Sequence, residues 1–230
     1  MNREVAVYLD QLKKEVSTST ATTRSAGRAR LIFALDATAS RQPTWDQACH
    51  ITGTMFEAVV GLGSLDVQLV FYRGYGECKT SKWVTTASEL HRLMRPVTCV
   101  GGQTQIERVF EHAIRETEKR RVVALIFIGD AMEENGDRLC HLAGKLGRFG
   151  TPLFILHEGH DRDATAWFKE LCRLTRGAYL AFELGSINRL KTLLGGIATY
   201  AVGGYTALAA YGQKHPNEAR QITAQLRGSR

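Results

Sequence analysis

The sequence lacks the features that mark several classes of protein. It has no run of five or more lysines and arginines, no Cys-x-x-Cys pair among its 5 cysteines, and only 4 prolines in 230 residues. The cysteines are odd in number and widely spaced, which argues against a zinc cluster or a disulfide framework and favours reduced thiols. The first residues contain no apolar stretch typical of a signal peptide, so we expect a cytoplasmic protein.

Positive charge is in moderate excess. Lys and Arg number 30 against 23 for Asp and Glu, which gives a formal net charge of +7. Such an excess attracts anionic partners, so a basic nucleic-acid-associated module is an alternative function. It is a weak one, because the charge is spread along the chain. The arginines near the two ends that motivate it are Arg24, Arg28, Arg30, Arg220, Arg227 and Arg230.

One stretch without charged residues, from 193 to 213, is about as long as a membrane-spanning helix. It is only weakly hydrophobic, because glycines and tyrosines interrupt it. The Gly203-Gly204 pair within it predicts a helix end followed by a turn. We therefore expect a packed terminal helix and no membrane association.

Hydrophobic patterning predicts an α/β protein. Buried strands are expected over 31–36, 67–72, 83–84, 122–128, 153–156 and 178–182. Helices are expected over 2–16, 44–62, 87–94, 105–119, 137–149, 163–175, 186–200 and 217–226. This alternation of strands and helices predicts a doubly wound, mostly parallel six-stranded sheet flanked by helices, a Rossmann-like three-layer sandwich.

Three polar motifs follow strands or open a helix. The first core strand leads into residues 36–40 (DATAS), and the most apolar strand leads to Asp130. A helix opens after residues 101–104 (GGQT), where glycines permit a close approach of the backbone. The carboxyl ends of parallel strands meet at one edge of a sheet, so Asp36 and Asp130 are expected to lie close together. Carboxylate and hydroxyl oxygens suit a small, hard cation.

Together these motifs resemble the metal-ion-dependent adhesion site (MIDAS) of the von Willebrand factor A (VWA) domain family. The pattern of that site is Asp-x-Ser-x-Ser, a distant Thr and a further Asp. This sequence departs from it once, with a Thr in place of the middle Ser, which keeps the hydroxyl. The resemblance implies a bound Mg²⁺, with Mn²⁺ or Ca²⁺ as alternatives. The residues that would hold it are Asp36, Thr38, Ser40, Thr104 and Asp130.

The resemblance covers roughly residues 30–200 and implies a domain division. Residues 1–28 would form an N-terminal helix and a Ser/Thr-rich linker, 29–202 the VWA domain, and 203–230 a C-terminal helical extension. In this family a carboxylate of the bound partner fills one coordination position of the metal. The implied function is a non-catalytic, Mg²⁺-dependent module for protein–protein interaction whose partner supplies an Asp or a Glu. Candidates for further partner contacts are Arg73, Tyr75, Gln103, Glu158 and His160.

An enzyme is the least favoured reading. Phosphatases of the haloacid dehalogenase type also place an Asp after the first strand, but they use a second acid two residues later, where this chain has Thr38. The sequence contains no phosphate-binding loop and no nucleophile elbow. A metal-dependent hydrolase stays open as an alternative.

Simpler explanations exist for three of the motifs. Ser40 could cap the helix expected to begin near residue 44. Residues 157–163 form either a second metal or partner-contact loop, or a solvated loop in which Asp161 or Asp163 caps the next helix. Residues 71–79 form either a rim that contacts the partner or an irregular loop leading to an edge strand.

Overall fold

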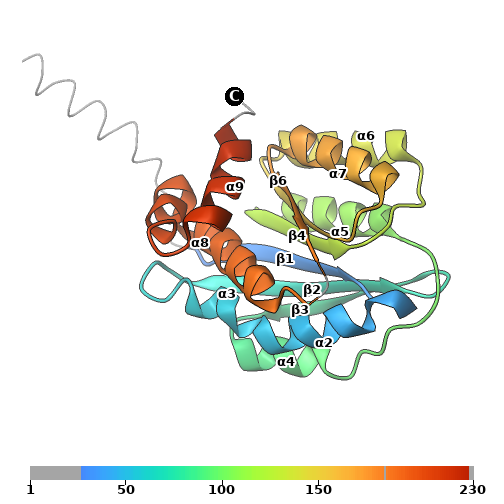
Figure 1. Cartoon of the computed structure of the whole chain (residues 1–230), viewed down its shortest axis with the longest axis horizontal. Coiled ribbons are helices and arrows are strands. Elements are labelled where there is room, and N and C mark those ends of the chain that lie inside the picture. Colours follow the sequence, from blue (N-terminus) through green and yellow to red (C-terminus); the bar gives the residue numbers. More distant parts are fainter. Residues whose placement is uncertain (1–26, 184, 228–230) are drawn as a thin grey trace, which may run out of the picture.

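The computed structural model of the chain describes residues 27–183 and 185–227. The helix predicted over 2–16 and two of the terminal arginines, Arg24 and Arg230, lie outside these residues. The described part forms one central sheet with helices on both faces (Figure 1).

The sheet confirms the predicted fold class. Its strands are β1 (Ala29–Asp36), β2 (Leu65–Arg73), β3 (Glu77–Val84), β4 (Ala124–Gly129), β5 (Leu153–Glu158) and β6 (Ala178–Phe182). Their order is β3-β2-β1-β4-β5-β6, and all neighbours are parallel except β2 and β3. The chain moves outward in opposite directions on the two sides of β1, so the topological switch point lies between β1 and β4.

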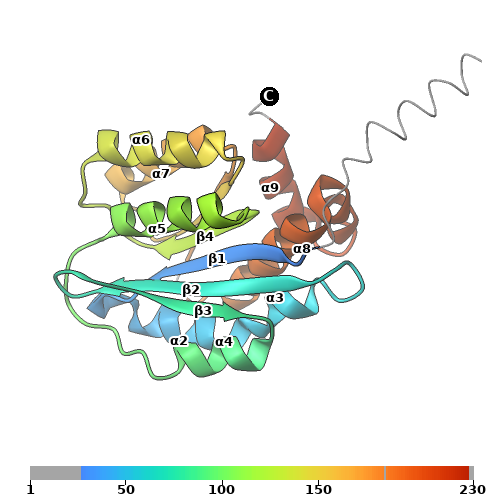
Figure 2. The same cartoon turned by 180° about the vertical axis from the view of Figure 1, so that it is seen from behind.

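Helices cover both faces, which explains why the central strands are apolar along their whole length. The helical elements are η1 (Ala39–Arg41), α2 (Gln42–Ile51), α3 (Gly53–Glu57), α4 (Ala87–Met94), α5 (Ile106–Lys119), α6 (Gly136–Arg148), α7 (Arg162–Thr175), α8 (Ile187–Tyr211) and α9 (Pro216–Arg227). Helices α2, α3, α4 and α8 pack on one face, and α5, α6 and α7 pack on the other (Figures 1 and 2).

Several predicted elements are wrong in extent, among them the helix expected over 186–200, which continues to Tyr211 as α8. The single helix expected over 44–62 is two pieces, α2 and α3, which begin at residue 42 and end at residue 57. The strand expected at 83–84 is the eight-residue β3, which pairs antiparallel with β2. Residues 71–79 are therefore a tight hairpin with a turn at 74–76, not an irregular loop. An edge strand such as β3 keeps polar residues on its exposed side, so it has no continuous apolar run to predict it from.

Helix α8 is long and apolar enough to cross a membrane by composition, but 50% of its most apolar window is buried inside the protein. It bends at Gly204, whose φ of 69° and ψ of −160° are not helical, within the predicted glycine-pair turn. Beyond the bend the chain packs back, and the Tyr211 hydroxyl donates to the Thr192 carbonyl at 3.0 Å. Leu208 and Ile222 are fully buried in this packing. The domain boundary at residue 203 stays a prediction.

A glutamine of α9 covers the outer edge of β6. The Gln225 side chain accepts from the Tyr179 N–H and donates to the Tyr179 carbonyl, both at 2.8 Å. We expect Gln225→Ala to lower the free energy of unfolding by about 1–2 kcal/mol, because the two backbone groups lose these partners. The variant should also self-associate more readily, since an open strand edge can pair with another chain. Urea denaturation and sedimentation would measure the two effects, and an unchanged midpoint would contradict the first.

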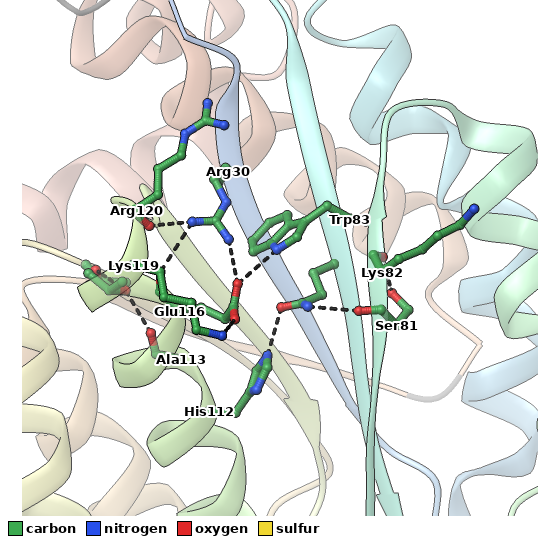
Figure 3. A network of polar contacts seen from close by, with 12 residues as sticks. Arg30, Ser81, Lys82, Trp83, His112, Ala113, Glu116, Lys119 and Arg120 are labelled. Carbon is green, nitrogen blue, oxygen red and sulfur yellow. Dashed lines mark hydrogen bonds and ion pairs between the residues drawn. The ribbon is translucent and has the colours of Figure 1, made fainter.

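A buried ion pair ties the start of β1 to the end of α5, at the sheet end opposite the carboxyl ends of the parallel strands (Figure 3). Arg30 and Glu116 are 6% and 7% exposed, and their Nη2 and Oε2 atoms are 2.6 Å apart. The Trp83 indole donates to the same carboxylate at 3.0 Å, and its ring lies 3.9 Å from the Arg30 guanidinium carbon. Lys119 approaches the other carboxylate oxygen at 2.7 Å.

Candidate metal centre

The switch point brings the two predicted aspartates to one edge of the sheet. Strands β1 and β4 are adjacent and parallel, with Leu35 paired to Ile128, so the residues after both strands emerge together. Asp36, the last residue of β1, is 3% exposed. The Asp130 side chain is 28% exposed. The convergence expected from the sequence is therefore present.

The segment after β1 turns back toward Asp130. The Thr38 N–H donates to the Asp36 carboxylate at 2.7 Å, a side-chain turn that short polar residues form readily. Two residues later the Ser40 hydroxyl donates to Asp130 Oδ2 at 3.1 Å. No side chain caps α2, so the alternative in which Ser40 is a helix cap is wrong. The hydroxyl contributes to the site instead.

Thr104 joins the site through a pair of reciprocal hydrogen bonds. The Glu133 N–H donates to the Thr104 hydroxyl at 3.1 Å, and the Thr104 N–H donates to the Glu133 carboxylate at 3.0 Å. The next acid, Glu134, accepts from the N–H groups of Ile106 and Glu107 at 2.6 and 2.8 Å, where a carboxylate also suits the helix dipole of α5. The loop after β4 thus fixes the start of α5.

All five predicted metal ligands line one open cavity of about 240 Å³. The remaining walls are short backbone segments and one further acid: Ala39, Gly101, Gly102, Ala131 and Glu133. Elsewhere in residues 27–183 and 185–227, as here, no three His, Cys, Asp or Glu side chains gather closely enough to hold a metal between them. A metal centre in this cavity must therefore use hydroxyls as well as carboxylates. Such an all-oxygen set suits Mg²⁺ and similar hard cations.

The electrostatics of the cavity favour a cation. Burial raises the pKa of the Asp36 carboxyl, the Thr38 N–H lowers it, and the nearby Asp130 carboxylate raises it again. The Tyr72 hydroxyl lies near enough to interact with Asp36, but it makes no hydrogen bond within the described chain. A positive charge next to the two aspartates would offset both the burial and the repulsion between them.

A buried arginine that was not predicted from the sequence, Arg41, contacts one of the two aspartates of the site. Arg41 is 4% exposed, pairs with Glu158 and lies 3.3 Å from Asp130 Oδ2. The Thr44 hydroxyl also donates to Glu158. Glu158 was predicted to contact a partner, and this prediction is wrong: it is 5% exposed and already bonded, because η1 and α2 cover the end of β5. Arg41 thus pairs with both Glu158 and Asp130, and counted together Arg41, Glu158, Asp36 and Asp130 carry two net negative charges.

The other predicted contact residues differ in the exposure of their side chains and in the bonds that these side chains already make. Tyr75 is 86% exposed, and Gln103 is exposed beside it. The Arg73 side chain is bonded to Glu77 at 3.0 Å and to the Thr98 carbonyl at 2.6 Å, so it holds the loop. His160 has an exposed side chain but does not line the cavity.

The segment 157–163 is structural over most of its length. His157 is fully buried and lies 2.8 Å from the Tyr179 hydroxyl and 3.1 Å from the Asp130 carbonyl. Burial lowers the pKa of His157. Asp161 caps α7 by accepting from the Ala164 N–H at 2.7 Å, as the simpler explanation predicted. A second metal in this segment therefore gains no support from the geometry.

Neither a protein-family model nor a curated protein matches the sequence. Solved structures do match the fold. The SpRpn10 VWA domain superposes with a TM-score of 0.58 over 71% of this chain and 95% of that domain, at 9% sequence identity. The chain has the von Willebrand factor A fold.

Two further solved structures match only part of a longer protein. Proximal thread matrix protein 1 from the mussel byssus, with a zinc-occupied MIDAS motif, gives a TM-score of 0.56 at 16% identity and covers 75% of this chain. The human COPII-coat protein Sec24c gives 0.52 at 9% identity and covers 80%. The match spans only 45% and 34% of those two proteins. At such identities the fold alone is shared, so the function must be argued from the residues of this chain.

Proposed function

We propose that this chain is a metal-dependent protein-interaction module that holds Mg²⁺ in the cavity and binds an Asp or Glu carboxylate of a partner. The observation that supports the proposal is the convergence of three separate segments on one cavity. They supply the carboxylates of Asp36 and Asp130 and the hydroxyls of Thr38, Ser40 and Thr104.

The charge of the cavity fits this role. The bound ion would supply two positive charges, and Asp36 and Asp130 together supply two negative ones. Arg41 and Glu158 offset each other beneath the site. The occupied site would then be close to neutral and could accept one more carboxylate, since Mg²⁺ readily keeps coordination positions for water or for an outside ligand. Mn²⁺ and Ca²⁺ accept the same donors.

The residues around the cavity fit catalysis less well than they fit binding. A hydrolase needs a base that can reach a metal-bound water. The imidazole of His157, which lies 3.1 Å from the Asp130 carbonyl, is buried and already bonded. All five cysteines are free, and burial raises the pKa of Cys99, the thiol that follows the α4 segment, to about 11. Such a thiol is not a ready nucleophile at neutral pH. We therefore propose binding and not turnover.

Nucleic-acid binding gains no specific support. Two of the arginines that motivated it are engaged within the protein, because Arg28 pairs with Asp66 and Arg30 pairs with Glu116. Arg220 lines a separate cavity together with Arg189 and the acid Glu218. Arg28 and Arg30 therefore add less unpaired positive charge to the surface than the sequence alone indicated.

Metal binding tests the proposal directly. Calorimetry of chelator-stripped protein is expected to show saturable one-site binding of Mg²⁺ and Mn²⁺. Asp36→Asn should weaken it by at least about 100-fold, because it removes a charged oxygen ligand that is already desolvated. Asp46→Asn changes an exposed carboxylate on α2 and serves as the matched control, with affinity unchanged. Absence of metal binding in the parent protein would overturn the proposal.

A further inference from the structure

The tip of the β2–β3 hairpin presents an exposed aromatic side chain next to the candidate metal centre. Tyr75 is 86% exposed, and Val100, in the loop that leads to α5, is 46% exposed. The hairpin tip and this loop lie together beyond the end of the sheet, at the right of Figure 1 and at the left of Figure 2. They form an apolar shoulder, defined here as Tyr75 and Val100.

The shoulder is held firmly by backbone hydrogen bonds. The Gln103 N–H donates to the Gly74 carbonyl at 3.2 Å, and the Gly74 N–H approaches the Val100 carbonyl at 3.5 Å. The Val100 N–H donates to the Ala37 carbonyl at 3.0 Å, which links the loop to the segment after β1. The Gln105 amide adds bonds to the carbonyls of residues 73 and 74, at 3.2 and 3.3 Å. An exposed tyrosine on such a support has little backbone freedom left to lose on binding.

The shoulder directly adjoins the cavity. Gly102 lines the cavity and packs so closely on the hairpin that an added Cβ would lie 2.2 Å from the Gly74 carbonyl oxygen. Tyr75 is the next residue along the chain. A group bound in the cavity and a group resting on Tyr75 would therefore be neighbours.

The position of Tyr75 next to the cavity indicates which chemical groups a partner should carry. Single exposed apolar residues are common and need no explanation. A rigid tyrosine is different, because aromatic anchors with few rotatable bonds supply much of the energy at protein interfaces. The cavity attracts a negative charge when it holds a cation, and the shoulder attracts apolar surface.

We propose that the partner is a protein segment in which an Asp or Glu lies within a few residues of a large apolar side chain. The carboxylate binds in the cavity and the apolar side chain packs on Tyr75 and Val100. This inference rests on the proposed metal-dependent function. It adds that an acid alone is a weak ligand and that Tyr75 determines specificity.

Phage-displayed random dodecapeptides, captured on the immobilised protein in Mg²⁺ and eluted with EDTA, provide the probe. The eluted sequences are expected to combine an acid with a large apolar residue a few positions away. A synthetic copy of the best one should bind Tyr75→Ala about 10-fold or more weakly than the parent. The calorimetric affinity of Tyr75→Ala for Mg²⁺ should be unchanged. Phe149→Ala changes an exposed aromatic between α6 and the start of β5, at the end of the sheet opposite the cavity, and should bind the peptide like the parent.

Each outcome decides between the two proposals. Acid-containing peptides that elute with EDTA, show no apolar preference and bind Tyr75→Ala as tightly as the parent would overturn the inference and leave the proposed function intact. Mg²⁺ binding without any EDTA-dependent peptide would overturn the partner-binding role and this inference together. Absence of Mg²⁺ binding in the parent would overturn the metal site itself.

Discussion

Replacing Glu116 by glutamine is expected to lower the free energy of unfolding by about 3–5 kcal/mol, the usual cost of breaking one side of a buried ion pair. The change leaves the guanidinium of Arg30, which is 6% exposed, without its negative partner. It also weakens the bonds that the same carboxylate accepts from Trp83 and Lys119 (Figure 3). These contacts join β1, β3 and α5, so their loss should be felt across the sheet.

The effect should depend on pH in a defined direction. Burial by itself raises the pKa of Glu116, but the bonds from Lys119, Trp83 and Arg30 outweigh it and lower the pKa from 4.5 to about 2. A depression of this size corresponds to about 3 kcal/mol of stability. That stability is present above the unfolded pKa, near 4.5, and is lost as pH falls through the folded pKa, near 2.

Urea denaturation of the parent and of Glu116→Gln, between neutral pH and about pH 3, would measure this dependence. The difference between them should be constant above about pH 5 and shrink below about pH 4.5, where the unfolded parent takes up a proton at Glu116 that the folded parent does not. Glu118→Gln alters an exposed acid of the same helix and should change stability by less than about 0.5 kcal/mol. A Glu116→Gln variant with the stability of the parent would show that the network adds no net stability.

Much of the fold could be predicted because local patterns and burial agree. The strands β1, β4 and β5 each contain an unbroken apolar run, since helices cover both of their faces. The ends of α4 and β6 were predicted to the residue. The extent of β3 was not predicted, because β3 lies at the edge of the sheet. An edge strand carries exposed polar residues, such as Lys79 and Lys82, and so has no continuous apolar run.

Only those parts of the site whose position follows directly from the ends of the strands could be predicted. Asp36 and Asp130 had to converge, because β1 and β4 run parallel at the switch point. No local pattern could show that Glu133 bonds to Thr104, which lies 29 residues earlier in the chain. The burial of Glu158 was equally hidden, since its partner Arg41 follows a different strand. Long-range polar pairs of this kind depend on the assembled fold.

Gly102→Ala is expected to weaken Mg²⁺ binding by about 10-fold or more, the range found when the support of a metal ligand is disturbed. An added Cβ would lie 2.2 Å from the carbonyl oxygen and 2.4 Å from the carbonyl carbon of Gly74. Both are backbone atoms, so the hairpin tip or the cavity loop must move. Overpacking of this kind should also cost about 1–3 kcal/mol of stability. Calorimetry and urea denaturation measure the two effects.

The neighbouring glycine provides the control that makes this prediction specific. A Cβ on Gly101 would meet no atom within 4 Å, although Gly101 lines the same cavity. Gly101→Ala should therefore keep the parent's metal affinity and stability, and equal losses in both variants would contradict the argument. Neither change removes a ligand atom, so a loss confined to Gly102→Ala would show that the placement of Thr104, two residues later, determines affinity. The same displacement would move Tyr75, so this variant should lose peptide affinity as well as metal affinity, whereas Tyr75→Ala should lose only the first.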